Sequence, residues 1–117
     1  MPTIFTCGSP LRRTRFSYEG DFDTGVLIRF KSGDVRISHA LLRAAVDHFK
    51  GREVRGGFSM TDPIPGGFGH WIESGSKALN GAPLTSRHGS FVAAILREMG
   101  YLDCILDGNA VVLRFRA

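Results

Sequence analysis

The stretch that decides the fold is residues 91–102, which read FVAAILREMGYL. Its apolar side chains recur at three- and four-residue spacing, as on one face of an α-helix, at Phe91, Val92, Ile95, Leu96 and Met99. Gly100 follows them and is typical of a helix C-terminus, because glycine adopts the left-handed conformation that ends many helices. A β-rich run begins at Tyr101. The stretch therefore predicts a helix, capped near Thr85 or Ser86, that leads through glycine into a strand.

Downstream of this helix, Asp107-Gly108-Asn109 is a turn signal between two β-rich runs, so residues 101–115 are predicted to form an antiparallel hairpin. Upstream, a helix is expected between the N-cap Ser38 and Gly51, then a short strand over residues 53–58, then a second helix from Gly67 or Phe68. The three helices share apolar positions that predict one core: Leu42, Val46, Phe49, Phe68, Ile72, Leu79, Phe91, Val92, Ile95 and Leu96.

The N-terminal part has a different pattern. Residues 1–15 are expected to form an arm with a basic cluster at Arg12, Arg13 and Arg15. Alternating apolar residues from Phe16, and the runs 26–30 and 35–37 around a turn with Gly33, predict a β-hairpin. The chain has 117 residues, which suits one domain, taken as residues 16–117.

Composition sets further limits. Apolar residues make up 43% of the chain and charged residues 22%, which is typical of a globular protein. No apolar run approaches the ~20 residues of a membrane helix. The formal charge of +4 permits an anionic partner such as nucleic acid. Cys7 and Cys104 have no metal-ligand spacing, and the start lacks a secretory signal, so we expect two free thiols in a reducing cytoplasm.

From Ser38 onward, the order helix, strand, helix, helix, strand, turn, strand resembles the winged helix-turn-helix architecture. The resemblance implies an α+β fold: a three-helix core with a C-terminal β-hairpin wing, to which this chain adds an N-terminal hairpin. It also implies a small non-catalytic domain that binds double-stranded DNA and regulates transcription. In such folds the third helix enters the major groove, and the wing touches the backbone or the minor groove.

Carried over by position, the resemblance places Ser86, Arg87, Ser90, Ala94 and Arg97 toward DNA. Arg87, near the helix start, is expected to meet a base edge, and Arg97 a phosphate. Further backbone contacts are expected from His70 and Lys77 on the second helix and from Arg12, Arg13 and Arg15 on the arm.

Two alternatives stay open. The turn at Asp107 carries no positive charge, and the small residues Gly89 and Ala93 would let another backbone approach closely, so the chain could be a protein-interaction module or a homodimer. A small-molecule site or an enzyme could instead use the glycine-rich residues 65–69. Those residues lack the spacing of a nucleotide-binding loop. The four histidines lack metal-ligand spacing, and no nucleophile motif is present. We therefore expect no catalytic residue, metal or cofactor.

Overall fold

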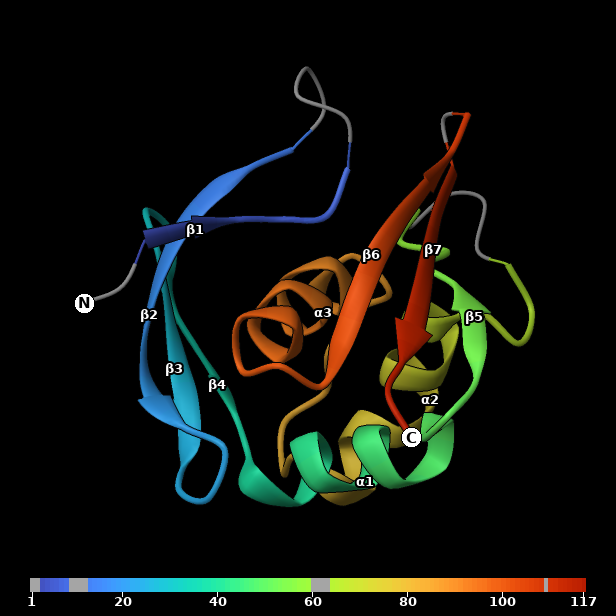
Figure 1. The fold of residues 1–117 in the computed structure, drawn as a ribbon. Helices are drawn as coiled ribbons and strands as arrows, with labels where there is room; N and C mark the ends of the chain where they lie inside the picture. Colours follow the sequence, from blue (N-terminus) through green and yellow to red (C-terminus); the bar gives the residue numbers. More distant parts are fainter. Residues whose placement is uncertain (1–2, 9–12, 60–63, 109) are drawn as a thin grey trace.

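The computed structural model describes residues 3–8, 13–59, 64–108 and 110–117. Over these residues the fold is α+β, with three helices and two antiparallel sheets (Figure 1). The first sheet has the strand order β1-β2-β3-β4. Its strands are β1 (Thr3–Phe5), β2 (Arg15–Asp21), β3 (Gly25–Phe30) and β4 (Gly33–Ile37). Part of the expected N-terminal arm is thus an edge strand, because residues 3–5 pair with residues 15–17 of β2.

The second sheet and the helices come from the rest of the chain. The helices are α1 (His39–Phe49), α2 (Phe68–Leu79) and α3 (His88–Glu98). The second sheet has the order β5-β7-β6, from β5 (Glu53–Arg55), β7 (Ala110–Phe115) and β6 (Leu102–Asp107). None of the helices in the described ranges is long and apolar enough to cross a lipid bilayer.

Both predicted hairpins are confirmed. In the first, Val26 of β3 faces Ile37 of β4, and Gly33, where the turn meets β4, has a φ of 136°, which favours glycine. In the second, β6 and β7 are paired along their whole length, from Leu102 opposite Phe115 to Asp107 opposite Ala110. Asn109, a member of the predicted turn, lies outside the described residues.

The helix starts agree with prediction at α1 and differ at α3. Ser38 caps α1 as expected, since its hydroxyl accepts a hydrogen bond from the Leu41 amide at 3.1 Å. The expected cap of α3 at Thr85 or Ser86 is wrong. Arg87 stands at the N-cap position and makes no side-chain cap bond. The chain already turns over residues 85–90, where successive amides donate to the carbonyls three residues earlier, so the helix needs no capping hydroxyl.

The predicted core is confirmed. Eight of its ten residues are buried, and Val46 and Leu79 pack partly buried against them. The central element is α3, which lies between the two sheets (Figure 1). Every residue from Phe91 to Leu96 is buried, so α3 is covered all round along its middle. This burial follows from the added N-terminal sheet, which packs on the side of α3 opposite β6 and β7 (Figure 1).

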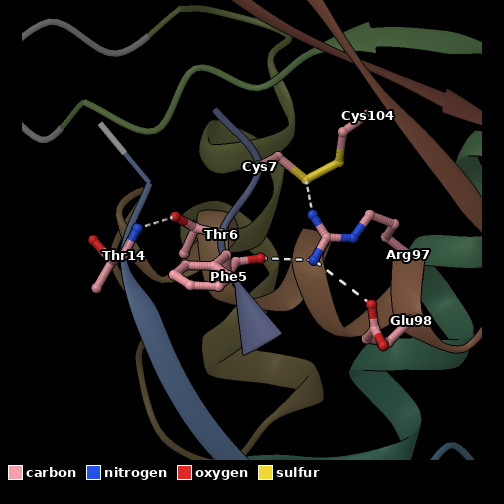
Figure 2. The surroundings of a disulfide bond; sticks show 7 residues. All are labelled: Phe5, Thr6, Cys7, Thr14, Arg97, Glu98 and Cys104. Carbon is pink, nitrogen blue, oxygen red and sulfur yellow. Dashed lines mark hydrogen bonds and ion pairs between the residues drawn. A yellow bond between two sulfur atoms is a disulfide. The ribbon is translucent and has the colours of Figure 1, made fainter. Parts of the chain in front are cut away.

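The expectation of two free thiols is wrong: Cys7 and Cys104 form a disulfide across 97 positions of sequence (Figure 2). The two Cα atoms are 5.9 Å apart, a usual separation for a disulfide. The spacing of the cysteines in sequence gave no sign of this, because only the packing of the first sheet over α3 brings the loop after β1 next to β6. The bond ties the edge of the first sheet to the second sheet.

Candidate nucleic-acid interface

A cavity of about 620 Å³ lies where the first sheet meets the start of α3. One wall comes from the beginning of β2, the end of β3 and the β3–β4 turn, and the other from residues 85–91. The two walls are far apart in sequence. The cavity exists because the N-terminal sheet packs beside α3 rather than elsewhere on the helical core.

Phenylalanine rings form the apolar interior of the cavity. Phe91 of α3 meets Phe16 of β2 edge to face, with ring centroids 4.9 Å apart and planes at 85°. Phe91 meets Phe30 of β3 in the same way, at 4.8 Å and 85°. Such perpendicular contacts are favourable for aromatic pairs. Phe16 and Phe91 are almost fully buried, while Phe30 is half-buried and lines the open part of the cavity.

The rim of the cavity is positively charged. Arg15, Lys31 and Arg87 line it and are exposed, and none of them has a carboxylate partner among the residues that the structure describes. Arg29 also lines it, but its guanidinium lies 2.7 Å from Glu19 and 2.6 Å from Asp34, which offset its charge. The rim therefore offers an anion three cations that are not already neutralised.

His88 contributes a polar group to the cavity wall. Its Nδ1 accepts a hydrogen bond from the Thr85 amide at 3.0 Å, so in the neutral ring the proton sits on Nε2. Burial lowers the pKa of His88 below its ordinary value of 6.5, and the charge of Arg87 lowers the pKa further. At neutral pH the ring is therefore an uncharged hydrogen-bond donor.

The structure brings together two of the residues expected to contact DNA, Arg15 and Arg87, which line the same cavity. The serines near them are engaged within the chain. Ser86 is buried, and its hydroxyl donates to the Ser59 carbonyl at 2.9 Å. The Ser90 hydroxyl donates to the carbonyl of Arg87, also at 2.9 Å. Both hydroxyl protons are thus used internally.

Farther along α3, Ala94 is fully buried and Arg97 is held by the N-terminal segment. The Arg97 guanidinium donates from Nη2 to the Phe5 carbonyl at 2.7 Å and from Nη1 to Cys7 Sγ at 3.7 Å (Figure 2). Its Nη2 also lies 3.7 Å from Glu98. In this structure the guanidinium fastens β1 and the disulfide loop onto α3.

The remaining expected contacts lie apart from the cavity. Arg13 is exposed, and its guanidinium stacks over the ring of Phe5, 4.3 Å from the centroid. Lys77 and His70 are exposed on α2 and line no part of the cavity. Arg12 lies outside the described residues. The expected contacts therefore do not form one surface along α3.

The small residues expected to serve self-association are used within the chain. Ala93 is fully buried. Gly89 is buried against α2, where a Cβ on Gly89 would come within 3.0 Å of the Gly69 Cα. In this structure neither residue presents a surface to a second copy.

The glycine-rich residues 65–69 likewise have a packing role. Gly67 is the N-cap of α2, and the Gly69 amide donates to the Gly56 carbonyl at 2.8 Å, so this amide is not open to an anion. A Cβ on Gly69 would collide with the Gly57 carbonyl oxygen and lie 2.8 Å from that of Ser86. Over the described ranges, no cluster of three or more His, Cys, Asp or Glu side chains is placed to hold a metal ion.

Reasoning from sequence missed Lys31, Phe30 and Phe16 as members of the site. Lys31 was part of a turn, and the two phenylalanines were part of strand patterns, with no local signal that they would meet α3. Comparison of the chain with protein-family models, curated proteins and solved structures finds no match.

Proposed function

We propose that this chain is a non-catalytic domain of winged-helix type that binds double-stranded DNA. The observation that carries the proposal is the cluster of unneutralised cations, Arg15, Lys31 and Arg87, at the start of α3. Cations that have no carboxylate partner contribute most to the binding free energy when they contact phosphate, because each contact releases a condensed counterion from the DNA. The net charge of +4 acts in the same direction.

The order of elements after β4 supports the winged-helix part of the proposal. Three helices pack with a small antiparallel sheet, and that sheet is made by the last hairpin together with the short strand after α1. The turn of this hairpin begins at the exposed Asp107, which would repel phosphate, and Arg114 on β7 is paired with Glu53 at 2.7 Å. The hairpin therefore contributes less to DNA binding in our proposal than the start of α3.

The covering of α3 changes the mode of binding that the resemblance implies. With the first sheet in place, α3 cannot lie lengthwise in the major groove, because residues 91–96 are buried. In our proposal the DNA backbone instead crosses the start of the helix. Arg87 contacts phosphates from the α3 side of the cavity, and Arg15 and Lys31 contact them from the side of the first sheet.

A second cavity also has cations in its lining and can be compared with the first. It has a volume of about 460 Å³ and is lined by Arg43, Lys50 and Arg116, but also by the carboxylate residue Asp47. Arg116 is further paired with Asp103 at 3.0 Å. Its cations are thus partly neutralised, which favours the first cavity as the phosphate-binding region and makes Lys50 a matched control for Lys31.

The proposal is tested by the affinity of the oxidised protein for a random-sequence duplex at about 50 and 200 mM salt. If several cations meet phosphate, the affinity falls steeply with salt, by a slope of about 0.9 for each phosphate contacted. Arg87→Gln is expected to lower that slope by about one. No measurable affinity at the lower salt concentration would contradict the proposal.

Self-association is the second candidate, and one observation favours it. β1 is the edge strand of the first sheet, and its Phe5 side chain is 39% exposed. Edge strands with exposed apolar residues can pair with a second chain. Sedimentation of the wild type and of Phe5→Lys distinguishes the two candidates. A dimer that the substitution abolishes, with no affinity for DNA, would favour the second.

A further inference from the structure

We propose that the cavity beside the start of α3 receives one unpaired nucleobase of the bound strand, while its rim holds the phosphates on either side of that base. This inference rests on the proposed function and adds to it the part of the nucleic acid that the site reads. It predicts a preference for DNA that already exposes a base.

The size and lining of the cavity fit a flat aromatic group. Its volume of about 620 Å³ lies within the ~300–1,000 Å³ of sites that hold small ligands, so a base and its sugar have room. Phe30 is half-buried and forms part of the wall, with Val35 of β4 beside it in the same lining. Bases stack on aromatic side chains with little dependence on sequence, because every base has a π-face.

Polar groups accompany this apolar wall. The Nε2–H of His88 has no partner among the described residues, and Ser32, whose side chain carries a hydroxyl, lines the cavity from the opposite wall. An apolar pocket with a few hydrogen-bonding groups is the usual composition of a site that orients a small polar molecule. The carbonyl oxygen of a pyrimidine is an acceptor that a neutral histidine donor suits.

The charges of the rim are placed for a strand that passes over the cavity. Lys31 lies in the β3–β4 turn, and Arg87 is the residue directly before α3. The two cations therefore come from opposite walls of the cavity. A nucleotide carries a phosphate on each side of its sugar. Cations on both walls therefore match a base held between two phosphates better than they match a single anionic group.

A base that is paired and stacked cannot enter the cavity, because extruding it costs a few kcal/mol. A duplex with one unpaired thymine, or a single strand, has already lost part of that pairing. Both are therefore expected to bind more tightly than an intact duplex of the same strand length.

The experiment measures fluorescence anisotropy of three probes whose labelled strands have the same length: an intact duplex, a duplex in which one thymine of the labelled strand is bulged, and single-stranded oligothymidine. On the wild-type protein we expect the bulged duplex to bind about tenfold more tightly than the intact one. Phe30→Leu keeps an apolar side chain but removes the ring, and is expected to abolish that difference. The matched control is Phe22→Leu at the second cavity, where Phe22 contacts Tyr101 with centroids 4.6 Å apart.

The outcomes separate this inference from the proposed function. Equal affinity of the wild type for the bulged and the intact duplex overturns the inference and leaves DNA binding standing. A preference that survives in Phe30→Leu and is lost in Phe22→Leu also overturns it. No affinity for the intact duplex overturns the proposed function itself. The ranking of the probes on the wild type needs no variant, so the test holds even if Phe30→Leu does not fold.

Discussion

The ring of Phe16 on β2 stands edge to face against the ring of Phe91 on α3, with centroids 4.9 Å apart. This contact joins the N-terminal sheet to the helix that the sheet covers, and both rings are almost fully buried. Both rings also line the cavity beside the start of α3. The stability of the core and the shape of the candidate site thus depend on one aromatic pair.

Replacing Phe91 with alanine is expected to lower the free energy of unfolding by about 3–5 kcal/mol, because it removes a buried ring and leaves a cavity. Urea denaturation measures this loss. A double-mutant cycle with Phe16→Ala should give a coupling of about 0.5–1.5 kcal/mol from the ring contact itself. Additive effects of the two substitutions would show that the rings do not interact as described.

Gly69→Ala tests the close packing of α2 against the backbone at Gly57 and Ser86. A methyl group there meets the carbonyl oxygens of Gly57 and Ser86, which are backbone atoms and cannot move away as a side chain would. We expect a loss of about 1–3 kcal/mol in the free energy of unfolding. Gly75→Ala on the same helix is the control, because its Cβ would meet only the Leu79 side chain at 3.6 Å. That substitution should stabilise the helix slightly. Equal effects of the two would contradict the packing.

Reduction of the disulfide is expected to destabilise the protein by about 2–5 kcal/mol, because the bond between Cys7 and Cys104 closes a long loop and restricts the unfolded chain. Denaturation with and without dithiothreitol measures the difference. The Cys7→Ser/Cys104→Ser variant should not respond to the reductant. If the wild type is also insensitive to it, the bond does not hold the N-terminal strand to β6.

The titration of His88 gives a pH dependence with a definite sign. Its pKa is lowered in the folded protein, so as the pH falls through its ordinary value of 6.5 the unfolded chain takes up a proton before the folded one does. The free energy of unfolding should therefore fall over that range and level off below the pKa of the folded state. Comparison with His88→Gln isolates this contribution from the other histidines. If the free energy of unfolding of the wild type and of His88→Gln depended on pH in the same way, the lowered pKa of His88 would be contradicted.

Local patterns predicted the elements well. The spacing of Phe91, Ile95 and Leu96 and the glycine at position 100 placed α3, and the runs around Gly33 and Gly108 placed the two hairpins, because helix period and turn chemistry act over a few residues. The site was predicted in part, since Arg15 and Arg87 carry charge that sequence shows directly. The rest depended on where the N-terminal sheet docks. That docking buries Ala94, fastens Arg97 to Phe5, and joins Cys7 to Cys104.

The most direct test of DNA binding at the start of α3 compares Lys31→Gln/Arg87→Gln with the control Lys50→Gln on a random duplex at about 50 and 200 mM salt. Each variant removes exposed cations and leaves the buried core untouched. We predict that the double variant loses most of its affinity for the duplex and that its salt slope is lower by about two. The control should lose no more affinity than one distant charge contributes. Equal affinity of the double variant and the control would contradict the proposed interface.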